Sequence, residues 1–204
     1  MVAYIFEPIL TKGAQSGRMP TLEQDSSRWF RNQAAKTTAS ATKLIASDRT
    51  RLTTIPMIGQ MYLFSYDPKG KKTLPYYDRF PLVIPFKAST TTGKASQGAG
   101  FYGLNLHYLP LVLRARLMDS LYQYVNNDKM DITTRIKLSY KLLNRVSTLK
   151  YFRPCVKQYL FSHLRSKFFY IEPKEWNIAL FLPIDRFMKA DNKTVYKESK
   201  RIIY

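Results

Sequence analysis

The sequence predicts an α+β fold: a small, strongly bent β-sheet, which could approach a barrel, with helices packed on one side. Two observations lead to this class. Before Pro110 the apolar runs are short and separated by glycine and proline, as strands are. After Pro110 the apolar residues follow helical spacing. We expect an N-terminal arm with a helix and a flexible linker at residues 1–54, a core domain at 55–185 and a basic tail at 186–204.

The N-terminal region contains one clear helix signal. Thr21 followed three residues later by Gln24 resembles a capping box, so we expect a helix to start there. Before it, the apolar residues 2–10 favour a strand or an anchoring arm, and residues 12–20 carry glycines without periodicity, as loops do. After it, residues 37–54 are basic and rich in Ser, Thr and Ala, which predicts a mobile linker.

Three apolar segments before Pro110 favour strands. The first covers residues 57–66 and ends at an Asp-Pro-Lys-Gly turn. Pro81 and Pro85 confine the second to a sheet edge or to the short Leu-Val-Ile piece between them, since proline donates no ladder hydrogen bond. The third, residues 101–109, is uncharged and apolar, and we expect it to be the central strand.

The second half of the chain favours helices. Pro110 suits the first turn of a helix over residues 111–125. A second helix is expected at residues 133–146 with a threonine as its N-cap, and a third at residues 154–166. Residues 168–171 then read as a returning strand. The inward face of the second helix should comprise Ile136, Tyr140, Leu142 and Leu143.

Charge is the strongest functional signal. The chain has 33 Lys+Arg against 14 Asp+Glu, a net charge of +19, and such a field attracts polyanions. Nucleic acid is the commonest such partner, followed by anionic membrane and acidic protein surfaces. The first residues lack a signal-peptide pattern and no apolar run approaches the roughly 20 residues of a membrane span, so we expect no membrane partner. Cys155, the single cysteine, excludes an intramolecular disulfide and a cysteine-based zinc site.

Signals for catalysis are weak. His107 lies inside the expected central strand, where a core histidine with one hydrogen bond is the ordinary interpretation, and His163 lies in a basic segment. Glu172 and Lys174 have the Glu-x-Lys form seen in metal-dependent nucleases, but such a site needs a second carboxylate and the nearest one upstream is Asp131. We therefore expect no enzyme, no catalytic or metal-binding residue and no cofactor, with a nuclease as the weaker alternative.

An acid-free basic segment is the best binding candidate. The second and third expected helices and the strand after them contain no Asp or Glu. Lys137, Lys141 and Arg145 are spaced i, i+4, i+8 on one helical face, and Arg153 and Lys157 repeat the spacing on the expected third helix. A solvated face normally mixes signs, whereas a polyanion would relieve this repulsion. The predicted nucleic-acid-binding residues are Arg135, Lys137, Lys141, Arg145, Lys150, Arg153, Lys157, Arg165 and Lys167.

Several segments resemble a known family. They are Met61-Tyr-Leu-Phe-Ser-Tyr-Asp-Pro68, Lys71-Lys-Thr-Leu-Pro-Tyr-Tyr-Asp-Arg-Phe-Pro81, Gly100 to Pro110, Tyr151-Phe-Arg-Pro-Cys-Val-Lys157 and Glu175-Trp-Asn-Ile-Ala-Leu-Phe-Leu-Pro183. Together they resemble the DNA-end-protecting, head-completion proteins of T-even-like tailed bacteriophages, over roughly residues 57–183. The resemblance implies a virion protein that caps the ends of the packaged genome and shields them from host exonuclease after injection. It implies no particular site residues.

Both lines of reasoning favour a non-enzymatic DNA-binding virion protein. No base-reading module is recognisable, so we expect contacts to the phosphates of double-stranded DNA ends with little sequence preference. Other virion proteins of the head, neck or tail would be further partners, in the virion and in the host cytoplasm during assembly and after injection. The alternative is a structural tail, neck or baseplate component, whose basic face would meet acidic neighbours or DNA passing through the tail.

Overall fold

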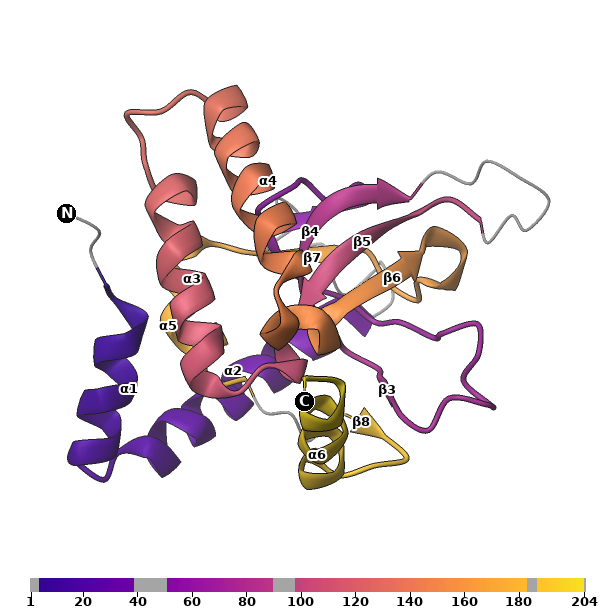
Figure 1. The fold of residues 1–204 in the computed structure, drawn as a ribbon, viewed down its shortest axis with the longest axis horizontal. Coiled ribbons are helices and arrows are strands. Elements are labelled where there is room, and N and C mark those ends of the chain that lie inside the picture. Colours follow the sequence, from indigo (N-terminus) through magenta and orange to yellow (C-terminus); the bar gives the residue numbers. More distant parts are fainter. Residues whose placement is uncertain (1–3, 39–50, 90–97, 183–186, 204) are drawn as a thin grey trace.

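The computed structural model describes residues 4–38, 51–89, 98–182 and 187–203. Its strands form a six-stranded antiparallel sheet in the order β1-β7-β2-β4-β5-β6 and a two-stranded sheet of β3 and β8. The helices pack on one side of the large sheet (Figure 1). The α+β class predicted from the sequence is confirmed.

The strands are β1 (Leu52–Thr53), β2 (Met61–Leu63), β3 (Tyr77–Asp78), β4 (Leu82–Ser89), β5 (Gly100–Asn105), β6 (Val156–Leu160), β7 (Phe168–Ile171) and β8 (Phe187–Met188). The α-helices are α1 (Phe6–Gln15), α2 (Met19–Thr38), α3 (Leu111–Val125), α4 (Ile132–Thr148), α5 (Trp176–Ala179) and α6 (Asn192–Ile203). Short 3-10 helices are η2 (Leu106–Tyr108), η3 (Lys150–Cys155), η4 (Phe161–His163) and η5 (Pro173–Glu175).

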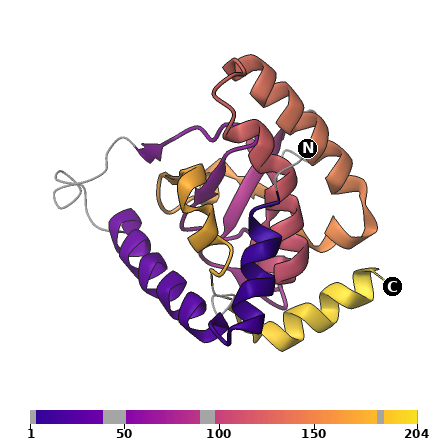
Figure 2. The same ribbon diagram turned by 90° about the vertical axis from the view of Figure 1, so that its left-hand side faces the viewer.

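The two faces of the large sheet contribute to two different hydrophobic clusters. Successive side chains of each strand point to opposite faces, so one strand can contribute to both clusters. The helix-side face contributes Met61, Leu63, Leu82, Ile84, Leu104, Phe169 and Ile171 to the main core. Figure 2 shows α1, α3 and α5 in front of the strands, flanked by α2, α4 and α6. The opposite face contributes Tyr62, Val83, Phe101, Tyr159 and Phe168 to a second, aromatic cluster with Phe64 and Tyr66.

The sheet bends so strongly that side chains from its nonadjacent strands meet and bury its aromatic face. Phe101 of β5 and Phe168 of β7 have ring centroids 5.6 Å apart, although β2 and β4 lie between their strands. The chain beyond β2 also meets the segment after β6, where Tyr66 forms an isolated bridge with Leu164 and the backbone N of Arg165 donates to the Ser65 carbonyl at 2.9 Å. The sheet is therefore strongly bent, as expected, and a single bridge in place of a ladder leaves it short of a closed barrel.

The N-terminal segment is helical where a strand or a loop was expected. α1 covers most of the described part of residues 2–10 and residues 12–15, and α2 covers residues 19–20, so both expectations are wrong there. Its cap comes from a distant helix: the buried Asp119 carboxylate of α3 accepts from the backbone N of Ile5 at 2.6 Å, Phe6 at 2.9 Å and Glu7 at 3.1 Å. This acceptor satisfies the free N–H groups at the start of α1, and local sequence could not reveal it.

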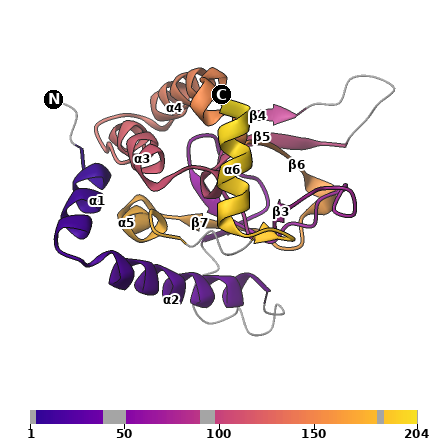
Figure 3. The same cartoon turned by 60° about the horizontal axis from the view of Figure 1, so that its bottom comes forward.

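The helix expected from Thr21 is confirmed and begins slightly earlier, with α2. Figure 3 shows that α5 lies between α2 and α3. Ser26 of α2 fixes this packing by donating from Oγ to the Ile178 carbonyl at 2.8 Å. Of the expected linker at residues 37–54, residues 39–50 lie outside the described residues, and Leu52–Thr53 form β1 against β7.

Pro85 lies in a central strand, so its expected confinement to an edge or a short piece is wrong. β4 pairs with β2 on one side and β5 on the other. The ladder to β5 shifts register between Pro85 and Lys87, and this irregularity accommodates a residue without N–H. The Pro85 carbonyl accepts a hydrogen bond from the backbone N of Gly59 at 3.0 Å.

The expected central strand is partly wrong, and the expected third helix is wrong. β5 ends at Asn105, because the Asn105 Oδ1 accepts from the backbone N of His107 at 3.0 Å and starts η2. The helix expected at residues 154–166 is replaced by the end of η3, by β6 and by η4. β6 extends the sheet by pairing with β5, and this long-range pairing outweighs the local helical spacing.

The first and the last described helices both contribute side chains to the main core. Phe6 of α1 and Val195 of α6 are both buried in it. Cys155, at the end of η3, is fully buried, with its Sγ 2.9 Å from the Phe152 carbonyl. Burial raises the pKa of this thiol well above its ordinary value. Among the described helices, none combines the length and the apolar character needed to cross a bilayer.

Candidate nucleic-acid interface

The N-cap of α4 is Asp131, which corrects the expected threonine cap. Its carboxylate accepts from the Thr134 hydroxyl at 2.6 Å and from the Thr134 backbone N at 2.9 Å. These two hydrogen bonds, the hydroxyl first, lower the pKa of Asp131 below its ordinary value. The cap fixes where α4 starts, and therefore which side chains face the sheet.

α4 directs one face to the core and presents its basic face to solvent. Ser139, Leu143 and Val146 are buried. Tyr140, expected to point inward, is 39% exposed, and the expected inward residues Ile136 and Leu142 are half-buried. Lys137, Lys141 and Arg145 are all exposed, and within the described residues none of them forms an ion pair. We call these three residues the α4 stripe.

The basic character continues from the α4 stripe into the next element. Lys150 and Arg153 are both exposed on η3, the 3-10 helix that leads from α4 to β6. Arg135, at the other end of α4, is half-buried, and its Nη1 lies 3.5 Å from the Val125 carbonyl. Arg135 also lines a cleft of about 210 Å³ with Tyr170 of β7. Exposed basic side chains therefore continue from α4 onto η3, which contacts it.

The remaining predicted residues have different surroundings. Lys157 is a half-buried residue of β6 and does not share a helix with Arg153. Its Nζ lies 4.0 Å from the centre of the Tyr108 ring. Loss of solvent around this ammonium lowers the pKa of Lys157. Arg165 and Lys167 are exposed in the turn between β6 and β7, and Arg165 pairs with Asp67 at 3.2 Å.

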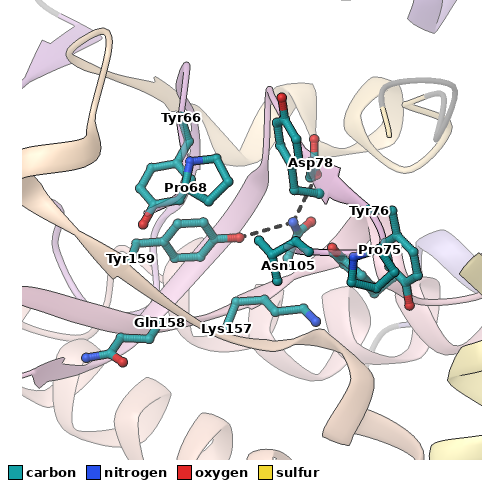
Figure 4. Close-up of a pocket in the computed structure, with 12 residues that line it drawn as sticks. Tyr66, Pro68, Pro75, Tyr76, Asp78, Asn105, Lys157, Gln158 and Tyr159 are labelled. Carbon is teal, nitrogen blue, oxygen red and sulfur yellow. Dashed lines mark hydrogen bonds between the residues drawn. The ribbon is translucent and has the colours of Figure 1, made fainter. Parts of the chain in front are cut away.

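A pocket that sequence reasoning missed opens beside Lys157. It has a cavity volume of about 310 Å³ and lies between β3, β5, β6 and the loop after Tyr66 (Figure 4). We call it the tyrosine pocket. Its lining is Tyr66, Pro68, Leu74, Pro75, Tyr76, Tyr77, Asp78, Asn105, Tyr108, Lys157, Gln158 and Tyr159.

A buried polar network forms one wall of the tyrosine pocket. Asp78 Oδ2 accepts from Asn105 Nδ2 at 2.9 Å and lies 2.8 Å from His107 Nδ1. Asn105 Nδ2 also donates to the Tyr159 hydroxyl at 3.1 Å. His107 is 1% exposed and its Nε2 has no partner among the described residues, so the expectation of a core histidine with one side-chain hydrogen bond is confirmed. Burial raises the pKa of Tyr159 well above its ordinary value.

The carboxylates considered for nuclease chemistry are held by basic neighbours. Glu172 Oε1 lies 3.1 Å from Arg51, and its Oε2 lies 2.5 Å from Lys174 Nζ. Arg51 also binds Glu175 at 2.7 Å. In the part of the chain that the structure describes, no group of three or more His, Cys, Asp or Glu side chains is arranged to hold a metal ion.

Comparisons with known proteins give one match. A family model described as phage T4 terminal DNA protecting protein matches residues 11–202, which is nearly the whole chain. No curated protein and no solved structure matches. The matched region includes the α4 stripe, η3 and every residue of the tyrosine pocket.

Proposed function

The chain belongs to the family of phage T4 terminal DNA protecting proteins, and we propose that it binds the ends of a packaged phage genome and shields them from host exonuclease. Binding would be to phosphates, without sequence preference. The protein would act as a component of the virion and, after injection, in the host cytoplasm, and it would contact other virion proteins at the site where the DNA end is held.

The observation that carries this proposal is the exposed α4 stripe with the basic η3 beside it. Lys137, Lys141 and Arg145 follow one another along a helix with no acidic residue in the same segment. Bringing DNA phosphates to this surface removes the repulsion between the like charges and releases counterions from the DNA, which favours binding at low salt. Phosphate contacts hold DNA of any sequence.

A role without catalysis fits the arrangement of the carboxylates. Metal-dependent cleavage of a phosphodiester needs carboxylates free to hold cations. Arg51 and Lys174 already neutralise Glu172, and Arg51 also binds Glu175. We therefore propose a protein that blocks access to the DNA end and leaves the DNA intact.

Exonuclease protection of linear duplex DNA tests the proposed function. The decisive variant carries Lys137→Glu, Lys141→Glu and Arg145→Glu together. Its control carries Lys12→Glu on α1, Arg18→Glu just before α2 and Arg31→Glu on α2, which are also exposed and change the net charge by the same amount. Because α1 and α2 lie away from α4 (Figures 1 and 3), the two variants separate the α4 stripe from the overall charge.

We expect the α4 variant to lose DNA affinity by a factor of about 100 or more, since three attractive phosphate contacts become repulsive. Protection of the DNA end should fail with it, while the control variant should retain most of the DNA affinity and of the protection. Thermal unfolding should show that each variant is folded. If the wild-type protein fails to protect linear DNA at low salt, the proposed function is wrong; if the α4 variant protects as well as the wild type, the stripe is not the DNA surface.

A further inference from the structure

We propose that the tyrosine pocket receives the unpaired terminal nucleotide of a DNA strand, and that this contact gives the protein its preference for DNA ends. The inference rests on the proposed function and adds the part of the DNA that is recognised. The α4 stripe meets the same phosphate backbone in the interior of a duplex as at its end, so it carries no information about a terminus. Preference for an end requires a second contact.

The size of the tyrosine pocket suits one nucleotide. Its volume of about 310 Å³ is at the lower end of the range of small-molecule sites and is far too small for a duplex. A nucleotide in the interior of a duplex must be unpaired and unstacked before it can enter such a pocket, and this is least costly where the base is already single-stranded. A strand end frays, so the pocket admits terminal nucleotides in preference to interior ones.

The walls of the tyrosine pocket offer aromatic surfaces for a base. Tyr66 and Tyr159 lie on one side of the cavity and Tyr76 lies on the other (Figure 4). Tyr76 and its neighbour Tyr77 line the cavity and are half-buried, so the rest of the fold does not cover either residue completely. Stacking on tyrosine tolerates any base, since every base has a π-face. The pocket therefore matches a protein that protects ends of any sequence.

Lys157 provides the positive charge inside the tyrosine pocket. Its side chain extends from β6 toward the side where Pro75 and Tyr76 lie (Figure 4), and its Nζ contacts the Tyr108 ring. Within the described residues no hydrogen bond or ion pair occupies this ammonium group. The nearby Asp78 carboxylate already binds Asn105 and His107. The N–H groups of Lys157 thus remain available for the phosphate of a bound nucleotide.

The path of the chain connects the tyrosine pocket to the α4 stripe. From Arg145 at the end of the stripe, η3 carries Lys150 and Arg153 and leads directly into β6 and Lys157. No acidic residue interrupts this path. Two carboxylates lie near the end of this path: Asp78, which is bound by Asn105 and His107, and Glu198 of α6, whose charge acts on Tyr76. A strand whose phosphates follow α4 and η3 would reach Lys157, the cation of the pocket, at its last nucleotide.

The test compares one DNA with and without ends. The probes are a relaxed, covalently closed minicircle and the same minicircle cut once to give blunt ends. The pocket variants are Lys157→Met, which removes the charge but keeps the aliphatic stem, and Leu74→Trp, which fills the mouth of the pocket at a rim residue and changes no charge. The control is Lys12→Met on α1, an exposed lysine outside both the stripe and the pocket.

We expect the wild-type protein and Lys12→Met to bind the cut DNA about tenfold more tightly than the circle, the ratio that one base–aromatic stack supplies. Both pocket variants should bring the two affinities within about twofold of each other, while their affinity for the circle stays near that of the Lys12→Met control. Melting temperatures identify a variant that fails to fold, and the other pocket variant then decides. If both pocket variants keep the preference for cut DNA, the pocket is not the end site although the protein binds ends. If the wild type binds both DNAs equally, there is no preference for ends and the inference about the pocket fails. If the wild type binds neither DNA, the proposed function itself fails.

Discussion

Gly100 lies in β5 directly against the backbone of β6. A Cβ at this position would lie 2.1 Å from the Tyr159 carbonyl O and 3.0 Å from its carbonyl C, which belong to the backbone of the neighbouring strand. Because a backbone atom cannot rotate away, we predict that Gly100→Ala destabilises the protein by about 2–3 kcal/mol in denaturant unfolding. Gly70→Ala is the matched control, since its nearest neighbour is a side-chain oxygen at 3.6 Å. Equal stability of the two variants would contradict the close packing of β5 against β6.

Asp131 makes the stability of α4 depend on pH. Its hydrogen bonds to Thr134 lower its folded-state pKa below the ordinary value of 3.8. The carboxylate therefore stabilises the fold above that ordinary value, and the contribution disappears as the pH falls through the lower folded-state pKa. We predict that Asp131→Ala lowers the melting temperature at neutral pH and that the gap between variant and wild type closes in acid. A gap that stays constant from neutral pH to the acid limit would show that the cap is not ionised.

Single residues show what local sequence can and cannot reveal. The uncharged surroundings of His107 indicated a core position, and the exposure of the α4 stripe followed from helical spacing. The partner of His107 could not be found in this way, because Asp78 lies 29 residues before it and reaches it through β3. The tyrosine pocket was missed for the same reason: its residues are unremarkable in sequence and become a site only when strands distant in the chain meet.

At the scale of elements, α1 depends on an acceptor supplied by α3. Asp119 satisfies backbone N–H groups at the start of α1 and is itself buried. We predict that Asp119→Ala destabilises the protein by about 2–3 kcal/mol, the combined effect of a lost cap and of charge-assisted hydrogen bonds left without an acceptor. Hydrogen exchange should become faster first in α1. Asp128→Ala, at an exposed acidic residue just beyond α3, is the control and should leave exchange in α1 unchanged.

Elements with strong local periodicity were predictable, and elements defined by pairing were not. α3, α4 and β7 appear close to where their patterns placed them. β6 was mistaken for a helix because the spacing of its residues fits either structure, and only its ladder with β5 decides between them. Pro85 wrongly indicated a sheet edge or a short strand, since the irregularity that lets a proline sit in β4 is a property of two strands together.

At the scale of the whole molecule, the net charge of +19 governs DNA binding. We predict that the affinity for duplex DNA falls steeply with salt, with a log–log slope of roughly −5 to −7 for about 5–8 phosphate contacts. Binding measured across a salt series with duplexes of unrelated sequence would check both the slope and the absence of base preference. An affinity that hardly changes between low and physiological salt would contradict a phosphate-binding surface.

The class of the fold was predictable because it follows from the order of strands and helices along the chain. The order of strands within the sheet was not. β2 pairs with β7 through Met61 and Ile171, which are 110 residues apart, and nothing in either segment identifies the other. The strong bend was expected from the shortness of the strands, yet its cause is visible only in space, where aromatic rings from nonadjacent strands fill the inner face.

Chemical labelling of the buried Cys155 would report how often the fold opens around it. As the only thiol in the chain, buried and with a raised pKa, it should be silent toward alkylating reagents while the fold is closed. Its labelling rate would then measure how often the region around η3 opens, without any introduced probe. The substitution Lys141→Cys would add a single exposed thiol that reacts while the fold is closed. A fluorophore there would signal the arrival of DNA, while the native thiol records whether the bound complex opens less often than the free protein.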